Sequence, residues 1–170
     1  SLTDAWAPEA RTYQLGRRCL EAILSQPDWS VRVLTKNVEL ENDLDLIARC
    51  ARTGKPLVLS TGLASREEIE EALETARKNG CQEIILLKCT STYPASPEHT
   101  NIRTIPDLEE RFSCQAGLSD HTMGIGIAVA SVALGAVLIE KHFTLRRADG
   151  GVDSAFSIEP DELRALVTET

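Results

Sequence analysis

The chain has 170 residues, which is the usual length of one domain with a single hydrophobic core. Hydrophobic residues make up 42% and charged residues 26%, a globular composition that excludes a disordered, fibrous or membrane-embedded chain. The formal net charge of -8 argues against a nucleic-acid partner, because phosphate backbones are bound by clustered Lys and Arg.

Neither a membrane span nor a secretory signal is expected. The apolar stretch from Ile125 to Val137 is too short to cross a bilayer and is interrupted by Gly126 and Gly135. The five cysteines form no CxxC or zinc-type pair, and an odd number at wide spacing predicts reduced thiols. We therefore expect a cytoplasmic protein with no membrane partner.

Short runs of Val, Ile and Leu alternate with helical patterns along the whole chain, which predicts βαβ units and a parallel sheet. Ser1 to Asp4 resembles the tail of a strand, and a helix from Pro8 to Ser25 begins at a proline. A strand at Val31 to Thr35 and a helix from Leu44 to Arg52 follow. The next strand is expected at Pro56 to Thr61.

The helix from Ser65 to Asn79 is the best marked element. Ser65 and Glu68 have the spacing of a capping box, and Gly80 supplies a left-handed stop. The later elements alternate in the same way. They are strands at Glu83 to Thr90, Ala116 to Asp120 and Ala136 to Phe143, and helices at Pro106 to Phe112, Ile125 to Leu134 and Pro160 to Val167.

These elements predict an α/β protein with a TIM-type parallel sheet. A complete eight-unit barrel takes about 250 residues, so we expect a partial barrel of about five to six β/α units over residues 1–170. An exposed edge of such a sheet favours pairing with another copy, which predicts a homo-oligomer.

Polar side chains follow four of the expected strands. In parallel β/α folds, ligands bind beyond the carboxyl ends of the strands, so these residues are the first functional candidates. The four groups are Ser60 to Gly62, Lys88 to Tyr93, Ser119 to Thr122, and Glu140 to His142. Four polar strand ends are hard to explain by packing alone.

Two of the three histidines, His121 and His142, lie at neighbouring strand ends. A two-imidazole site with open positions suits Mn, Fe, Co or Zn, with water or substrate oxygens completing the coordination. The alternative is that each ring is a structural hydrogen-bonding group. His99 lies in a loop of Pro, Ser, Glu and Asn, where we expect it to be exposed.

Glu140 lies two residues before His142 and so points to the same face of its strand, where it could orient substrate or move a proton. The alternative is an ion pair with Lys88. Lys141 points to the opposite face and is expected to be structural. Ser60 and Ser119 are placed to contact a phosphate or, equally, to cap helices, and Lys88 could add positive charge.

From about Gly54 to Val167 the sequence resembles the sialic acid synthase family, which condenses phosphoenolpyruvate with an amino sugar. The matching stretches are Gly54 to Gly62, Leu86 to Pro94, Gly117 to Thr122 and Leu134 to Leu145. Lys88 to Ser91 and Gly150 to Ser157 look more like the pseudaminic acid synthases of that family. The resemblance implies a nonulosonic acid synthase whose substrate is a diacetamido-trideoxy hexose.

The same resemblance implies roles for particular residues. His121 and His142 would be manganese ligands, Ser60, Ser91 and Ser119 would lie near phosphoenolpyruvate, and Tyr93, Glu140 and Asp153 would face the sugar. The metal would polarise the open-chain aldehyde for attack by C3 of phosphoenolpyruvate.

The first part of the chain, about Leu2 to Ala48, resembles a barrel segment of radical S-adenosylmethionine proteins of the photoproduct-lyase type. The cluster motif CxxxCxxC of that family is absent, so we expect no iron–sulfur cluster. The resemblance predicts that residues 1–48 have a different origin from the synthase-like residues 49–170. Because the first strands of the synthase barrel have no counterpart here, the alternative to an enzyme is a fused or designed half-barrel without turnover.

Overall fold

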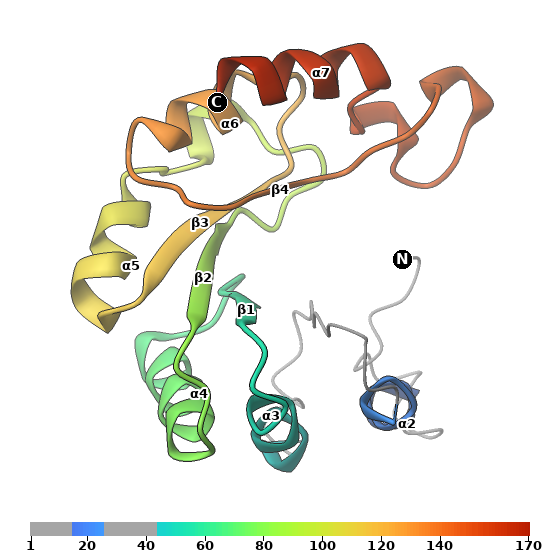
Figure 1. Ribbon diagram of the computed structural model, residues 1–170. Coiled ribbons are helices and arrows are strands. Elements are labelled where there is room, and N and C mark those ends of the chain that lie inside the picture. Colours follow the sequence, from blue (N-terminus) through green and yellow to red (C-terminus); the bar gives the residue numbers. More distant parts are fainter. Residues whose placement is uncertain (1–14, 26–43) are drawn as a thin grey trace. The chain divides into compact units, whose positions relative to one another are not determined.

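The computed structural model describes residues 15–25 and 44–170, and its strands form one sheet in the order β1-β2-β3-β4 (Figure 1). Sheet order follows chain order, as crossover connections between parallel strands produce. The α/β class with a partial, TIM-type barrel sheet is thereby confirmed. The strands are β1 (Leu57–Ser60), β2 (Ile84–Cys89), β3 (Gln115–Asp120) and β4 (Ile139–Lys141).

Contacts divide the chain into two compact units. The first comprises residues 1–59 and 63–85, and the second residues 60–62 and 86–170. The strands expected at Ser1 to Asp4 and Val31 to Thr35 lie outside the described residues. All the candidate site residues named above belong to the second unit.

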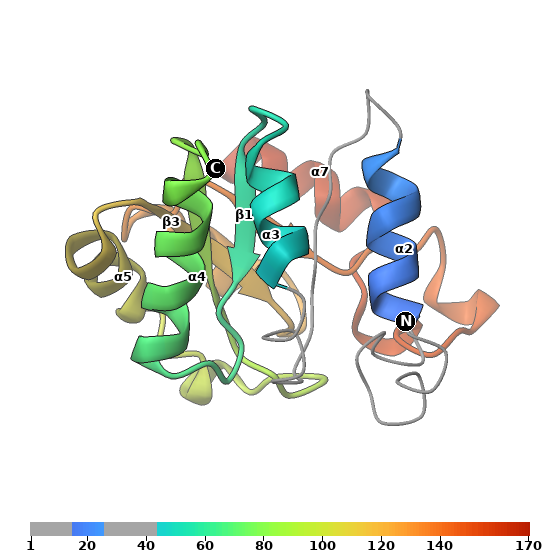
Figure 2. The same cartoon turned by 90° about the horizontal axis from the view of Figure 1, so that it is seen from below.

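The first unit contains helices that contact one another in chain order. They are α2 (Leu15–Leu24), α3 (Leu44–Ala51) and α4 (Arg66–Lys78). The predicted capping box is present, because Ser65 accepts from the Glu68 amide and the Glu68 carboxylate accepts from the Ser65 amide. Gly80 follows α4 with φ +96°, as the predicted stop requires. Helix α3 packs against both α2 and α4 (Figure 2).

The second unit contains α5 (Thr104–Phe112), α6 (Gly126–Val132) and α7 (Pro160–Glu169). Helices α5 and α6 both contact β3, and α6 also contacts α7. One hydrophobic cluster of this unit is formed by Ala128, Ile158 and Leu166, with Ile125, Val129 and Ile139 packed against them. Among the described residues, no helix is long and apolar enough to cross a membrane.

Strands β3 and β4 pair in parallel, with Ser119 opposite Glu140 and Asp120 opposite Lys141. Gly117 lets them approach closely. A Cβ at this position would lie 2.3 Å from the Leu138 carbonyl oxygen and 2.8 Å from Leu87 Cδ2, so only glycine fits. The register therefore brings the two polar strand ends side by side.

Strand β4 ends earlier than the expected strand, which ran to Phe143. Phe143 instead forms an isolated parallel bridge with Ile158. The chain thus leaves β3 after Lys141 and pairs with the segment that returns to α7. The backbone hydrogen bonds of this new pairing run from Ile158 to His142 (2.9 Å) and from Thr144 to Ile158 (3.0 Å).

Candidate functional site

The rings of His121 and His142 lie close together just beyond the ends of β3 and β4. Their centroids are 5.2 Å apart and their planes are tilted by 58°. His121 is 2% exposed, whereas His142 is half-buried. Because the preceding residues Ser119 and Glu140 are partners in the sheet register, the two strands themselves set the spacing of the rings.

An oxygen atom faces Nδ1 of each ring. His121 Nδ1 lies 3.1 Å from the carbonyl oxygen of Thr90. A carbonyl can only accept, so Nδ1 donates and Nε2 carries the lone pair in the neutral ring. His142 Nδ1 lies 3.6 Å from Asp153 Oδ2, which favours the same tautomer. A carboxylate or carbonyl behind a histidine is the usual way of orienting it as a metal ligand.

Two other aromatic rings pack against the histidines. The Tyr93 ring lies 4.3 Å from His121 and 6.1 Å from His142, centroid to centroid. Phe156 lies 5.2 Å from His142. Burial raises the pKa of the Tyr93 phenol, with smaller contributions from Cys89 and Asp153, so the hydroxyl stays protonated at neutral pH. In the sequence Phe156 is one residue of the Gly150 to Ser157 segment, and no local pattern predicts this contact.

Glu140 accepts a hydrogen bond from the hydroxyl of Ser119, with 2.5 Å between the oxygens. Ser119 is 1% exposed. The Ser60 hydroxyl oxygen is buried and has no hydrogen-bond partner among the described residues. The capping alternative for these two serines is wrong, because α4 is capped by Ser65 and the Ser119 hydroxyl is directed to Glu140.

Lys88 is half-buried, and burial lowers the pKa of its ammonium group. Its Nζ donates to the Thr90 hydroxyl at 2.5 Å and to the Cys89 carbonyl at 3.2 Å. These contacts differ from the alternative in which Lys88 pairs with Glu140. Ser91 is nearby, with its hydroxyl 3.8 Å from Cys89 Sγ.

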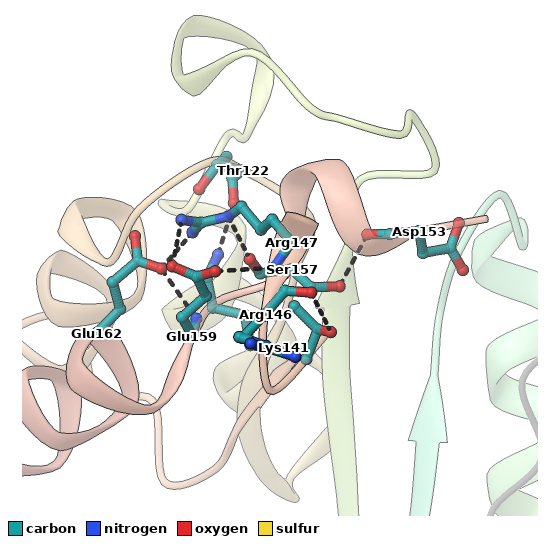
Figure 3. Close-up of polar contacts among 9 residues, drawn as sticks. Thr122, Lys141, Arg146, Arg147, Asp153, Ser157, Glu159 and Glu162 are labelled. Carbon is teal, nitrogen blue, oxygen red and sulfur yellow. Dashed lines mark hydrogen bonds and ion pairs between the residues drawn. The ribbon is translucent and has the colours of Figure 1, made fainter. Parts of the chain in front are cut away.

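Lys141 lies on the opposite face of the same strand pair, as the alternation predicts. Its Nζ donates to Asp120 Oδ2 at 2.7 Å and to the Thr122 carbonyl at 2.6 Å (Figure 3). Asp120 Oδ1 in turn accepts from the amide and the hydroxyl of Thr122, at 2.9 and 2.8 Å. The buried Asp120–Lys141 pair and its hydrogen bonds to Thr122 hold the backbone on both sides of His121. The alternation of side chains along the strand predicted the face to which Lys141 points, but not the residues that it contacts.

The donor chemistry fits a metal bound through two imidazoles, with positions left for water or substrate. Within residues 15–25 and 44–170, no group of three or more His, Cys, Asp or Glu side chains has the arrangement of a metal site. His121 and His142 are thus the candidate protein ligands, and a metal role for them is a proposal. None of the five cysteines, all of which lie in the described residues, forms a disulfide.

Comparison with known proteins identifies the family. The model of the NeuB family matches residues 38–170. The chain belongs to the NeuB family. It is 46% identical over 129 residues to the N,N'-diacetyllegionaminic acid synthase of Campylobacter jejuni, a match covering 75% of this chain and 39% of the relative. It is 41% identical over 126 residues to the pseudaminic acid synthase of the same species, covering 74% and 37%.

Solved structures agree with this assignment. An N-acetylneuraminic acid (sialic acid) synthetase from Leptospira borgpetersenii, crystallised with citrate, is 39% identical with a TM-score of 0.70, over 76% of this chain and 45% of that one. A truncated 3-deoxy-D-arabino-heptulosonate 7-phosphate synthase from Thermotoga maritima covers 94% of this chain and 66% of its own. It has a TM-score of 0.72 at 19% identity, so it shows a shared fold alone.

The chain spans well under half the length of the curated relatives, 39% and 37% of the two Campylobacter synthases. The family match begins at residue 38, ahead of the boundary expected near Ala48. A separate origin for residues 1–48 stays a prediction, since much of that segment lies outside the described residues.

Proposed function

We propose that the chain forms part of an enzyme that condenses phosphoenolpyruvate with an amino sugar to make a nonulosonic acid. One observation carries the proposal: the paired rings of His121 and His142 at neighbouring strand ends, 5.2 Å apart, in a chain of the NeuB family. Relatives are named as synthases of legionaminic and pseudaminic acids and of N-acetylneuraminate 9-phosphate.

The proposed reaction joins C3 of phosphoenolpyruvate to the aldehyde carbon of the open-chain sugar. Water then adds at C2, and the phosphate leaves as the keto acid forms. His121 and His142 would hold a divalent metal, manganese in our proposal, whose Lewis acidity would act on the sugar aldehyde. The orienting contacts from Thr90 and Asp153 support this role, because both favour a lone pair on Nε2.

Phosphoenolpyruvate would lie near Ser60, Ser91, Ser119 and Lys88. The buried hydroxyl of Ser60, which lacks a partner among the described residues, supports a polar ligand at this point. The Lys88 ammonium supplies local positive charge in a chain with a net charge of -8. Anionic substrates need such compensation.

The sugar would face Tyr93, Glu140 and Asp153. Glu140 is half-buried and lies on β4, opposite Ser119 of β3. This position is suited to orienting a hydroxyl or moving a proton. The protonated Tyr93 hydroxyl can donate a hydrogen bond. Asp153 is held near His142, so a sugar oxygen at the metal would also be near this carboxylate.

Within the family we propose the pseudaminic type, with a diacetamido-trideoxy hexose as substrate. Support comes from the Lys88 to Ser91 and Gly150 to Ser157 segments rather than from overall identity, since the quoted legionaminic acid relative is 46% identical and the pseudaminic acid relative 41%. We also propose a cytoplasmic homo-oligomer that uses no iron–sulfur cluster and binds no nucleic acid.

The direct test is release of inorganic phosphate from phosphoenolpyruvate. The chain would be incubated with Mn²⁺ and, in separate reactions, the amino-sugar precursors of pseudaminic, legionaminic and neuraminic acids. We expect release that depends on sugar and is fastest with the pseudaminic precursor. Absence of release with every sugar would favour the fused half-barrel without turnover, which should still bind Mn²⁺.

A further inference from the structure

The segment between β4 and α7, residues 143–159, carries two side chains to His142. Asp153 Oδ2 lies 3.6 Å from His142 Nδ1, and the Phe156 ring centroid lies 5.2 Å from that of His142. Phe156 is buried, whereas Asp153 is half-buried. The conformation of this segment, which we call the returning loop, therefore determines the surroundings of one candidate metal ligand.

Backbone hydrogen bonds between Ile158, His142 and Thr144 close the base of the returning loop. Beyond that base, Arg147 on the outgoing arm contacts the incoming arm and the first turn of α7 (Figure 3). Its Nε donates to the Ser157 carbonyl at 2.9 Å, and Nη1 lies 3.3 Å from Glu159 Oε2. Nη2 also pairs with Glu162, and the Arg147 amide donates to Glu159 Oε1 at 2.8 Å.

The incoming arm passes this restraint on to Asp153. The Ser157 hydroxyl and amide both donate to the Asp153 carbonyl, at 2.7 and 3.2 Å. Ser157 is 3% exposed, so these bonds are protected from water. A continuous set of contacts thus runs from the Arg147 guanidinium through Ser157 to Asp153, which faces His142.

We propose that Arg147 is a positioning residue that holds the returning loop in the conformation in which Asp153 and Phe156 lie against His142. A planar guanidinium with five donors can contact a carbonyl and two carboxylates at once, which a lysine ammonium cannot do in the same geometry. The guanidinium is partly exposed, so its effect comes from joining two arms rather than from a strong single ion pair. The consequence for sugar binding rests on the proposed function.

Arg146 provides a matched control. It is the neighbouring arginine and is 75% exposed, and within the part of the chain that the structure describes its side chain pairs with Asp149, three residues along. Replacing it removes the same charge from the same loop without separating the two arms. The test compares Arg147→Met, Arg147→Lys and Arg146→Met with the unaltered chain.

The first measurement is amide hydrogen exchange in a peptide covering residues 152–159, with a peptide from β3 reporting whether the fold is intact. Loss of charged hydrogen bonds predicts faster exchange in Arg147→Met, by about 10-fold or more, with β3 unchanged. Arg147→Lys should recover part of the protection, and Arg146→Met should behave as the unaltered chain. Equal exchange in Arg147→Met and the unaltered chain would overturn the proposal.

The second measurement separates this role from mere stability. If the unaltered chain releases phosphate, Arg147→Met should raise the KM for the sugar by about 10-fold and leave the KM for phosphoenolpyruvate unchanged. An unchanged sugar KM despite faster exchange would overturn the positioning role. Faster exchange in a chain that never releases phosphate would instead contradict the proposed function and leave the restraint by Arg147 standing.

Discussion

The two faces of the β3–β4 pair carry polar residues at adjacent positions but use them differently. The lysine face consists of Asp120, Thr122 and Lys141, and its ion pair is 1% and 4% exposed. Its charged groups are held by four hydrogen bonds within the face. The histidine face consists of Ser119, His121, Glu140 and His142, where two rings and a carboxylate converge. Because side chains alternate between the two faces, the structural ion pair and the candidate site occupy adjacent residues of the same two strands.

Breaking the lysine face should have the largest effect on stability. Lys141→Met leaves the Asp120 carboxylate buried without its cation, which should lower the free energy of unfolding by about 3–5 kcal/mol in urea titrations. The double variant Lys141→Met/Asp120→Asn removes the uncompensated charge and should recover part of that loss. A loss below about 1 kcal/mol in the single variant would contradict a structural role.

Altering the histidine face should instead affect the proposed condensation. Glu140→Gln keeps the size of the side chain and an oxygen that can accept from Ser119, so the free energy of unfolding should change by less than about 1 kcal/mol. Phosphate release should fall by about 100-fold or more if Glu140 moves a proton. Glu110→Gln, an exposed carboxylate on α5, is the control. Full activity in Glu140→Gln would remove Glu140 from the site.

Gly117 offers a smaller and purely steric test on the histidine face. In Gly117→Ala the new Cβ would meet the Leu138 carbonyl at 2.3 Å, so the strands must separate, at a cost of about 1–3 kcal/mol in unfolding free energy. The matched control is Gly126→Ala in α6, where nothing lies within 4 Å and alanine should be neutral or stabilising. Equal stability of the two variants would show that the close approach at Gly117 is not needed.

Several features of the fold and of the candidate site could be predicted from the sequence, because they depend on local patterns. Each of these features lies within a short segment of the chain. They are the capping box at Ser65, the polar strand ends, and the two-residue period that separates Glu140 from Lys141. Contacts between distant segments could not be predicted in this way, since Asp120 and Lys141 meet only through the register of β3 and β4. The contacts of Arg147 with Glu159 and Glu162 likewise depend on how the returning loop folds back.

The early end of β4 could not be predicted for the same reason, because it too depends on a contact between distant segments. Phe143 continues an apolar strand pattern, yet the structure pairs it with Ile158, fifteen residues further along the chain. Local propensity favoured extended backbone correctly but could not choose between two partners. The same pairing brings Asp153 and Phe156 to His142. The family resemblance named Asp153 as a site residue, but no local pattern predicted that it and Phe156 would contact His142.

The central assignment in the proposed site is the pairing of His121 and His142 as metal ligands. Titration of Mn²⁺ by calorimetry should compare the unaltered chain with His121→Ala, His142→Ala and, as control, the exposed third histidine in His99→Ala. Removing either ligand should weaken binding by about 100-fold or more, while His99→Ala binds as the unaltered chain does. Unchanged affinity in both His121→Ala and His142→Ala would contradict the assignment of this site.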